Sequence, residues 1–215
     1  VELGLDSVAE ILSRGGTILG TSRTNPYKKP EDVNRVIENY KKLKLDALIA
    51  IGGEDTLGVA NKLNKENKAV NVVGCPKTID NDLSATDYTF GFDTAVNTAT
   101  EAIDRLRTTT ESHHRVMVVE IMGRHAGWLA LHAGIASGAH VILLPEFPVD
   151  LDEVCAVLMK RKSEGHQFSI VVTAEGAEFK AGQTVLKEKE LDAFGHVLLG
   201  GIAENLAAEI EKRTG

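Results

Sequence analysis

The 215-residue sequence has few aromatic residues, two cysteines and no excess of positive charge. Aromatic residues make up only 5% of the chain, but hydrophobic residues make up 43%, which is ordinary for a globular protein. Because the formal net charge is -7 and a nucleic-acid-binding face must be strongly basic, we expect no nucleic-acid partner. The two cysteines, Cys75 and Cys155, lie far apart, which argues against a disulfide framework and favours the reducing cytoplasm.

The chain also lacks the features of exported and membrane-inserted proteins. No apolar run reaches the roughly 18 residues that a transmembrane helix needs, and no charged-then-apolar signal segment opens the sequence. We therefore expect a cytoplasmic protein with no membrane partner. The sequence starts at Val1 without a methionine and ends in a helical pattern with no strand after it, so we interpret it as a fragment or a trimmed chain.

Two common nucleotide-binding turns are missing as well. The sequence contains neither the Gly-x-Gly-x-x-Gly turn of dinucleotide-binding domains nor the Gly-Lys-Ser/Thr end of a P-loop. The neighbouring His113 and His114 have no further ligand at a spacing that is typical of zinc sites. The sequence therefore argues against a dehydrogenase, a P-loop enzyme and a zinc protein.

The chain does contain a regular alternation of helical and strand patterns. Apolar residues at helical spacing alternate with short apolar runs, which is typical of a doubly wound parallel sheet. The expected strands are 47–51, 69–73, 116–121, 140–144 and 168–173. The expected helices are 6–14, a helix that begins near Pro30, 56–64, 93–108, 126–136, 151–162 and 195–212.

A polar stretch at 77–89 interrupts this alternation, and we place a domain change near Gly91. The expected fold class is α/β, with two three-layer α/β lobes, mostly parallel sheets and an active-site cleft between the lobes. Residues 1–91 would form the first lobe and residues 92–215 the second.

The first candidate motif is Gly-Gly-Glu-Asp-Thr at 52–56, directly after an expected strand. Glycines allow the backbone to approach a phosphate closely, and N–H groups at a helix start face such an anion. The carboxylates of Glu54 and Asp55 would repel a phosphate unless a cation lies between the carboxylates and the phosphate. One of the two residues is therefore a candidate Mg²⁺ ligand. The alternative is a plain turn followed by two acidic residues that interact favourably with the helix dipole.

The second motif is Lys-Thr-Ile-Asp-Asn-Asp at 77–82. Asp80 could take a proton from an alcohol, as an aspartate does in phosphoryl transfer. Asp82 could supply a metal-linked acid, and Lys77 a cation for the phosphoryl oxygens. Simple turn chemistry is the alternative, because aspartate and asparagine are common in turns.

The third motif is Met-Gly-Arg-His at 122–125, again at the end of an expected strand. The planar guanidinium of Arg124 could bind a phosphate through two hydrogen bonds. The alternative is an ion pair on the protein surface. Glu175, at another strand end, suits sugar hydroxyls, and Trp128 is expected in the core. Because ligands bind at the carboxyl ends of such strands, we expect these strand ends to present acids, arginines and glycines to one cleft, which predicts phosphoryl transfer to a sugar-sized alcohol.

These motifs resemble those of the 6-phosphofructokinase family. The resemblance rests on Gly-Gly-Glu-Asp-Thr at 52–56, Pro-Lys-Thr-Ile-Asp-Asn-Asp at 76–82, Met-Gly-Arg-His-Ala-Gly-Trp at 122–128 and Gly-Gly-Thr-Ile-Leu-Gly-Thr-Ser-Arg at 15–23. It implies a phosphofructokinase-like fold. Residues 1–91 would be the phosphoryl-donor lobe, incomplete at its N-terminus and without its C-terminal return, and residues 92–215 a nearly complete fructose 6-phosphate lobe.

The resemblance implies that Asp80 deprotonates the 1-hydroxyl of fructose 6-phosphate and that Arg124 stabilises charge on the transferring phosphoryl group. The implied catalytic residues are Lys77, Thr78, Asp80 and Arg124. The implied fructose 6-phosphate residues are Thr78, Asp80, Asp82, Arg115, Met122, Gly123, Arg124 and Glu175. The implied donor-binding residues are Arg23, Gly53, Glu54, Asp55, Thr56 and Lys77.

A metal cofactor and an assembly are also implied by the resemblance. Glu54 and Asp82 would bind Mg²⁺, and Glu54 stands where the family has an aspartate. Arg115 matches an arginine that reaches into the sugar site of a neighbouring subunit, which implies a homodimer or a homotetramer. The reaction would belong to glycolysis and gluconeogenesis.

Two positions indicate pyrophosphate as the phosphoryl donor. Members that use ATP usually have glycine at the positions of Asp55 and Lys77. A carboxylate at position 55 would collide with the α-phosphate of a nucleotide and repel it, and such a contact discriminates strongly between ligands. Lys77 would add a cation beside the transferring group, but similar residues also occur in some ATP-using bacterial members, so the inference depends mostly on Asp55.

Three alternatives stay open. The first is an ATP-dependent 6-phosphofructokinase. The second is the lipid or NAD kinase group, which shares a Gly-Gly-Asp-Gly turn but is not expected to have the Thr-Ile-Asp-Asn-Asp loop. The third is a non-catalytic paralogue that binds sugar phosphate, against which Asp80 and Arg124 argue.

The family's glycine-rich donor loop is expected upstream of Val1, and further sugar-site residues are expected downstream of Gly215. We therefore expect the chain alone to be inactive.

Overall fold

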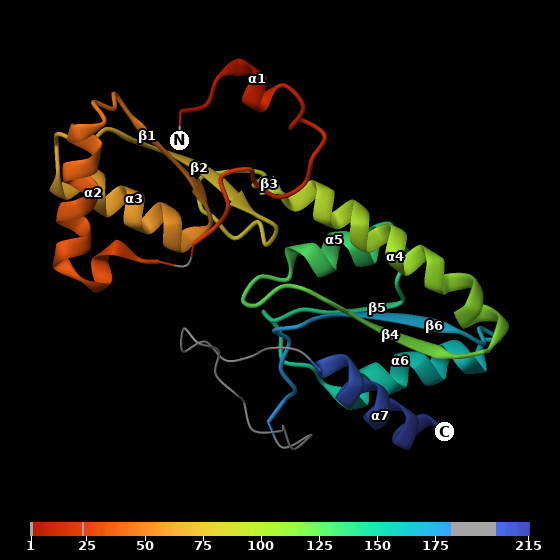
Figure 1. Cartoon of the computed structure of the whole chain (residues 1–215). Coiled ribbons are helices and arrows are strands. Elements are labelled where there is room, and N and C mark those ends of the chain that lie inside the picture. The colour runs from red at the N-terminus through yellow and green to blue at the C-terminus, as the bar shows by residue number, and fades with distance from the viewer. Residues whose placement is uncertain (1, 23, 182–200) are drawn as a thin grey trace. The chain divides into compact units, whose positions relative to one another are not determined.

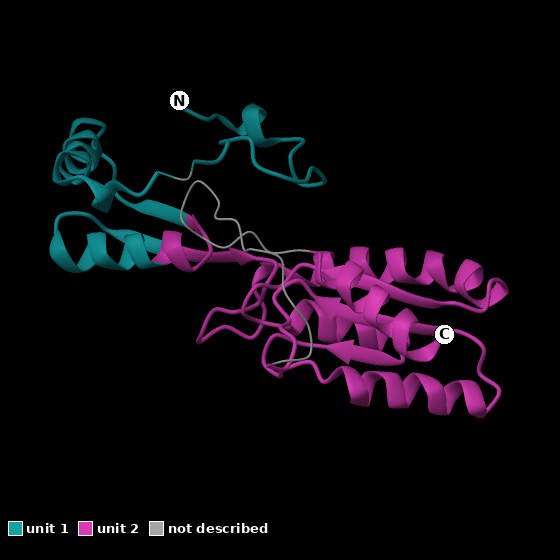
Figure 2. Cartoon of the chain, turned by 90° about the horizontal axis from the view of Figure 1, so that it is seen from below, with its two compact units in different colours: residues 1–50, 58–73 teal, residues 51–57, 74–215 magenta. Residues whose placement is uncertain are grey.

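The computed structural model describes residues 2–22, 24–181 and 201–215 (Figure 1). The chain divides into two compact units (Figure 2). Unit 1 comprises Val1–Ala50 and Gly58–Val73, and unit 2 comprises Ile51–Leu57 and Gly74–Gly215. These bounds are not those of the two predicted lobes, 1–91 and 92–215, whose division by substrate stays a prediction.

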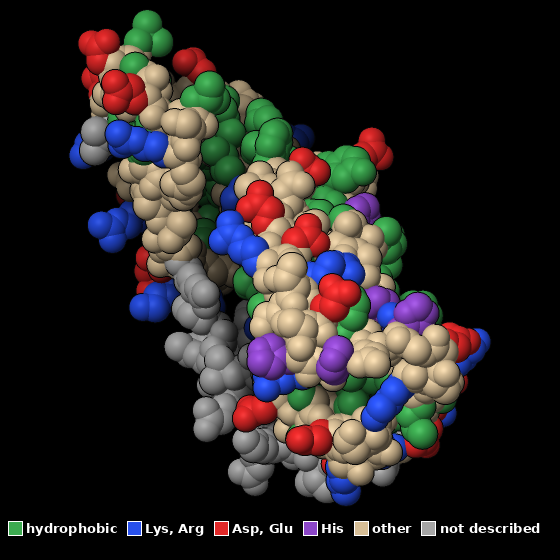
Figure 3. Space-filling view, turned by 90° about the vertical axis from the view of Figure 1, so that its right-hand side faces the viewer, with side chains coloured by type: hydrophobic (Ala, Val, Ile, Leu, Met, Phe, Trp, Pro, Cys, Tyr) green, Lys and Arg blue, Asp and Glu red, His purple; other side chains and the backbone are tan. Residues whose placement is uncertain are grey.

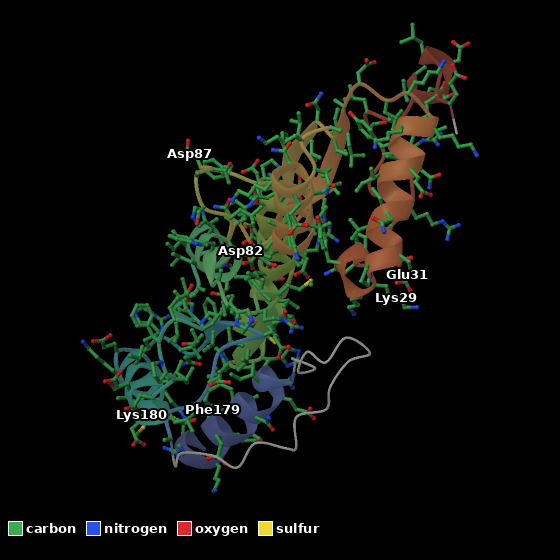
Figure 4. The ribbon with its side chains drawn as sticks, turned by 90° about the vertical axis from the view of Figure 1, so that its left-hand side faces the viewer. Lys29, Glu31, Asp82, Asp87, Phe179 and Lys180 are labelled. Atoms are coloured by element: carbon green, nitrogen blue, oxygen red, sulfur yellow. The ribbon has the colours of Figure 1, made fainter. Side chains whose placement is uncertain are left out.

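Unit 1 is built around helix α2 (Pro30–Lys42) and most of helix α3 (Glu54–Glu66). The predicted start of α2 at Pro30 is confirmed. The ring of proline suits the first helical position, Glu31 lies in the first turn, and Lys41 and Lys42 lie in the last turn, so both helix ends have favourable charges (Figure 4). The small core of the unit has three buried residues, Tyr40, Leu63 and Val70.

The first predicted helix, 6–14, is wrong in length, because α1 spans only Leu5–Val8. None of its residues is buried, and Leu12 beyond its end is fully exposed. A helix this short gains little from its own hydrogen bonds and needs a packed apolar face. A short 3₁₀ helix, η1 (Pro26–Lys28), precedes α2.

The first sheet has the strand order β1-β2-β3, with β1 at Leu48–Gly52, β2 at Val72–Thr78 and β3 at Phe90–Gly91. Strand β2 differs from the predicted strand 69–73, because Gly74 and Pro76 do not end it. A Cβ atom at Gly74 would lie 2.9 Å from Cδ2 of Leu57, so this glycine serves close packing and not a turn. Lys77 and Thr78 therefore lie on β2, parallel to β3, and the polar loop begins at Ile79.

Unit 2 contains a second parallel sheet between two layers of helices. Its strand order is β4 (Val116–Ile121), β6 (Ser169–Ala174) and β5 (Val141–Leu143). Helices α4 (Phe92–Ser112) and α5 (Trp128–Ala136) cover one face, and α6 (Leu151–Ser163) and α7 (Ile202–Thr214) cover the other (Figure 1). The expected three-layer α/β arrangement with a parallel sheet is confirmed for this unit.

The central strand β6 is buried along its whole length, as expected of a strand that is covered on both faces. Val171 faces the cluster formed with α6 and α7. Ile170, Val172 and Ala174 belong to the cluster on the opposite face, which follows from the alternation of side chains along a strand. Within the described residues, no helix is long and apolar enough to cross a membrane.

The last helix was predicted at 195–212, and α7 begins at Ile202. Residues 195–200 of that prediction lie outside the described residues. The start of α7 is held by a side chain from the sheet, because the carboxylate of Glu120 on β4 accepts hydrogen bonds from the N–H groups of Gly201 and Ala203 at 3.2 and 3.0 Å.

Candidate active site

The carboxyl ends of β4 and β6 lie in register and bring two of the predicted motifs together. Ile121 pairs with Ala174, so the residues after them leave the sheet at one edge. The N–H of Glu175 donates to the carbonyl oxygen of Ile121 at 2.8 Å, and Oε1 of Glu175 accepts from the N–H of Gly123 at 3.4 Å. Glu175 thus lies beside the loop that contains Arg124.

Two glycines allow these loops to pack closely. Gly123 has φ 150°, a backbone conformation that favours glycine. The N–H of Gly176 donates to the carbonyl oxygen of Gly123 at 3.0 Å, and a Cβ atom at position 176 would overlap the carbonyl oxygen of Arg124. The segments that end β4 and β6 are therefore fixed against one another by backbone contacts.

Asp80 lies half-buried on the loop between β2 and β3, the loop that also contains Asp82 and Asp87 (Figure 4). Its N–H donates to Oγ1 of Thr78 at 3.2 Å. The preceding residue, Ile79, packs against the apolar cluster formed with α4 and α5, which anchors the start of the loop in unit 2.

The electrostatics of Asp80 show which predicted residues surround it. Burial, and then the nearby carboxylates of Asp82 and Glu175, raise the pKa of Asp80 above its ordinary range. A hydrogen bond from Thr78 and the charge of Arg124 lower the same pKa. The structure thus brings these five residues together, from three loops of unit 2 and the end of strand β2. A carboxylate with a raised pKa is well suited to accept a proton.

The Gly-Gly-Glu-Asp-Thr motif lies next to the end of β2. A Cβ atom at Gly53 would lie 3.9 Å from the carbonyl oxygen of Lys77 and 3.9 Å from Cβ of Thr78. Glu54 and Asp55 form the first turn of α3, and both side chains are exposed. This placement is compatible with the donor role and also with the alternative of two acidic residues at a helix start.

The predicted metal ligands do not form a complete protein cage. Among the described residues, no group of three or more histidines, cysteines and acidic residues could hold a metal ion. Glu54 and Asp82 supply oxygen atoms, and Mg²⁺ is usually bound by one or two carboxylates together with water and substrate phosphates. The two side chains fit that pattern, and their role stays a prediction.

Arg115 lies at the opposite edge of the same sheet. It directly precedes β4, whereas Met122 directly follows it, so the two residues are roughly 23 Å apart at about 3.3 Å per strand residue. Arg115 lines a groove of about 520 Å³ together with Lys162 and His166. Several histidines gather on this face, among both basic and acidic side chains (Figure 3). Arg115 is therefore not brought to Asp80 within one chain.

Residues 1–215 match the family described as phosphofructokinase. The chain belongs to the phosphofructokinase family. It is 62% identical over 213 residues to the pyrophosphate–fructose 6-phosphate 1-phosphotransferase of Amycolatopsis methanolica, covering 99% of this chain and 62% of that protein.

Another similar phosphofructokinase is named as an ATP-dependent enzyme and not as a pyrophosphate-dependent one. The chain is 53% identical over 215 residues to the ATP-dependent 6-phosphofructokinase 3 of Streptomyces coelicolor, covering 100% of this chain and 62% of that protein. The chain thus spans 62% of the length of both relatives. Phosphofructokinase from Saccharomyces cerevisiae has a similar structure, with a TM-score of 0.77 and 31% identity, covering 98% of this chain and 29% of that one.

Within the phosphofructokinase fold, sequence reasoning missed three residues that hold the site loops. Oε1 of Glu146 accepts from the N–H of Gly127 at 2.8 Å and fixes the end of the loop that contains Arg124. Asn81 and Thr89 bond to one another across the loop of Asp80. The only signal for Glu146 was an acidic residue just after an expected strand, and Asn81 was visible only as part of the motif.

Two further predictions need comment. Arg23, predicted to contact the donor, lies outside the described residues. Trp128, expected in the core, is 47% exposed, so that expectation is wrong. It is the first residue of α5, whose buried face is formed by Leu129, Ala130 and Ala133, and its ring contacts the ring of His132 edge-on.

Proposed function

We propose that the complete protein transfers a phosphoryl group from pyrophosphate to the 1-hydroxyl of fructose 6-phosphate and forms fructose 1,6-bisphosphate. The observation that supports this most is the grouping of Asp80, Asp82, Glu175 and Arg124 at one edge of unit 2. The high similarity to a protein named as a pyrophosphate-dependent enzyme points the same way.

In the proposed reaction, the carboxylate of Asp80 takes the proton of the 1-hydroxyl. The resulting oxygen attacks the terminal phosphorus of pyrophosphate, the bond to the bridging oxygen breaks, and inorganic phosphate leaves. Arg124 and Lys77 stabilise the negative charge of the transferring group. Because a phosphoanhydride bond of modest energy is broken, the reaction is readily reversible.

The proposal includes Mg²⁺ as cofactor, with Glu54 and Asp82 as its protein ligands. When bound, the ion neutralises phosphate oxygens of the donor. Asp82 also helps to keep the pKa of Asp80 raised in the described structure, because its carboxylate is close.

We assign the donor from Asp55. This carboxylate lies exposed in the first turn of α3, two residues after Gly53, which lies next to the strand end that contains Lys77. A nucleotide would bring its α-phosphate against this negative charge, whereas pyrophosphate has no α-phosphate. An ATP-dependent enzyme is the second candidate, because the ATP-dependent relative in Streptomyces coelicolor is 53% identical.

A homo-oligomer is also part of the proposal. Arg115 is too far from Asp80 to serve the site of its own chain, and it lines a groove at the other edge of the sheet. We therefore assign it to the fructose 6-phosphate site of a neighbouring subunit in a dimer or tetramer. A cytoplasmic location and a place in glycolysis and gluconeogenesis complete the proposal.

The test is steady-state formation of fructose 1,6-bisphosphate by the complete protein, with Mg²⁺ and either pyrophosphate or ATP. We expect turnover with pyrophosphate and little or none with ATP. Turnover with ATP alone would favour the second candidate. Absence of turnover with both donors, together with binding of fructose 6-phosphate, would favour a non-catalytic paralogue.

A further inference from the structure

The loop that contains Asp80 is closed by hydrogen bonds between two residues near its ends. Oδ1 of Asn81 accepts from the N–H of Thr89 at 2.9 Å, and Nδ2 of Asn81 donates to the carbonyl oxygen of Asp87 at 3.2 Å. Thr89 is 4% exposed, so its bond to Asn81 is protected from competition by water, whereas the bond of Asn81 to Asp87 is exposed. Together the two residues bridge the start and the end of the loop.

The hydroxyl of Thr89 extends this connection toward Asp80. Oγ1 of Thr89 donates to the carbonyl oxygen of Thr78 at 2.7 Å and lies 3.3 Å from Oδ1 of Asn81. A hydroxyl has one proton, so the shorter contact is the main bond. Oγ1 of Thr78 accepts from the backbone N–H of Asp80, so Thr78 is bonded through its carbonyl oxygen to Thr89 and through its hydroxyl to Asp80.

The backbone of Asn81 explains why asparagine stands there. Its φ is 53°, in the left-handed region, which asparagine adopts more readily than most residues. Its side chain has both an acceptor and a donor, and it uses one for the N–H of Thr89 and the other for the carbonyl of Asp87. An ionised aspartate could not supply both bonds, because it has no donor.

We propose that Asn81 and Thr89, the Asn81–Thr89 clamp, position the carboxylate of Asp80 for proton abstraction without touching substrate themselves. This inference rests on the proposed function, because the position of Asp80 matters to turnover only if Asp80 is the base. A reacting group on a loop without such bonds would sample many positions. Displacement of a catalytic group by about 1 Å can cost roughly a hundredfold in rate.

The main test compares Thr89→Val with Thr89→Ser in the complete protein. Valine keeps the shape of threonine but removes the hydroxyl, and serine keeps the hydroxyl. We expect Thr89→Val to lower kcat roughly tenfold to a hundredfold while KM for fructose 6-phosphate and pyrophosphate changes less than about threefold. Thr89→Ser should recover most of the native kcat, and a serine variant as slow as the valine variant would contradict the role of the hydroxyl.

Thr110→Val is the matched control. Thr110 is a fully buried threonine of α4, and its hydroxyl also donates to a backbone carbonyl, that of Leu106 at 2.5 Å. The control loses a comparable bond outside the loop. We expect it to lower the thermal midpoint of unfolding but to keep the native kcat. A similar fall in kcat in both valine variants would mean that general destabilisation is responsible, which would overturn the proposal.

Asn81→Gly provides a second, independent variant if Thr89→Val does not fold. Glycine accepts the positive φ without strain, so this change removes the two side-chain bonds and keeps the turn. We expect the same selective fall in kcat.

Asp80→Asn distinguishes a failure of the proposed clamp from a failure of the base assignment. If Asp80→Asn is inactive while Asn81→Gly and Thr89→Val keep native kcat, the clamp is wrong and the proposed function stands. Native turnover by Asp80→Asn would refute Asp80 as the base and the clamp with it, whereas no turnover by the unaltered protein would refute the proposed function.

Discussion

The two edges of the β4-β6-β5 sheet differ in the charges that surround their ionisable groups. At the carboxyl edge, burial and the carboxylates of Asp82 and Glu175 raise the pKa of Asp80. This edge collects acids and one arginine around a candidate proton acceptor. It is the edge at which ligands of parallel α/β sheets bind.

The amino edge shows the opposite pattern around His140, next to the start of β5. Burial, chiefly, and then the positive charges of Arg161, Arg107 and His166 lower the pKa of His140. The same edge has the groove lined by Arg115. The same sheet therefore has acidic groups around Asp80 at one edge and positive charges around His140 at the other, where we propose that Arg115 contacts the substrate of a neighbouring subunit.

Among changes at the carboxyl edge, we expect Arg124→Lys to lower kcat the most after loss of the base Asp80. Lysine keeps the positive charge but loses the planar group that can bind two phosphoryl oxygens. We expect kcat to fall roughly a hundredfold or more, with a smaller change in KM, in a coupled assay with pyrophosphate. Arg105→Lys on α4 is a matched control that should keep native kcat, and native kcat in Arg124→Lys would remove this residue from the transferring group.

The proposed role of the amino edge can be tested by mixing two inactive variants. Arg115→Ala should lack the contact to the neighbouring site, and Asp80→Asn should lack the base. If the variants exchange subunits at random in a dimer, one of the two sites in each hybrid is native, so about a quarter of the native activity should return. No recovery after verified subunit exchange would place Arg115 outside the neighbouring site.

The choice of phosphoryl donor can be tested by replacing Asp55. Asp55→Gly removes the charge that we expect to repel the α-phosphate of ATP. Because a single like-charge contact discriminates strongly, kcat/KM for ATP should rise at least about tenfold, while pyrophosphate is used similarly or less well. Glu31→Gly, in the first turn of α2, controls for loss of an acidic residue at a helix start. No gain with ATP would mean that Asp55 does not select the donor.

The smallest expected effect concerns the pH dependence of stability at the amino edge. Nδ1 of His140 accepts from the N–H of Ile170 at 2.8 Å, which requires the unprotonated nitrogen. The pKa in the folded state is lowered, so stability is complete above the unfolded value of about 6.5 and is lost as pH falls below it. The thermal midpoint of unfolding should therefore decrease as the pH is lowered from about 7.5 to about 5.5. A His140→Gln variant should lose part of this pH dependence, and an unchanged dependence would exclude His140 as a cause.

Much of the fold followed from periodicity. The strands 116–121 and 168–173 were predicted nearly as found because they are short apolar runs in a fully covered sheet. Strand β2 was misplaced because Gly74 and Pro76 are usual turn residues, and the actual role of Gly74 depends on a contact with Leu57 from another segment. Local patterns do not contain such contacts between segments.

The site shows the same limit. Asp80, Arg124 and Glu175 were predicted because each follows a strand. Strands β4 and β6 end at one edge of one sheet, whereas β2, which precedes Asp80, belongs to the other sheet. The bonds of Asn81 to Thr89 and of Glu146 to Gly127 were not predicted, because they join residues 8 and 19 positions apart across irregular loops. The position of Arg115 at the far edge also required the structure, although its role in a neighbouring site was implied by the family resemblance.

The most direct test of the account is the turnover of Asp80→Asn in the complete protein with pyrophosphate, fructose 6-phosphate and Mg²⁺, compared with Asp87→Asn from the same loop. Asparagine has nearly the shape of aspartate but cannot accept the proton. We predict that kcat of Asp80→Asn falls by roughly a thousandfold, with sugar-phosphate binding retained, while Asp87→Asn stays near the native rate. An Asp80→Asn protein that turns over at the native rate would contradict the account.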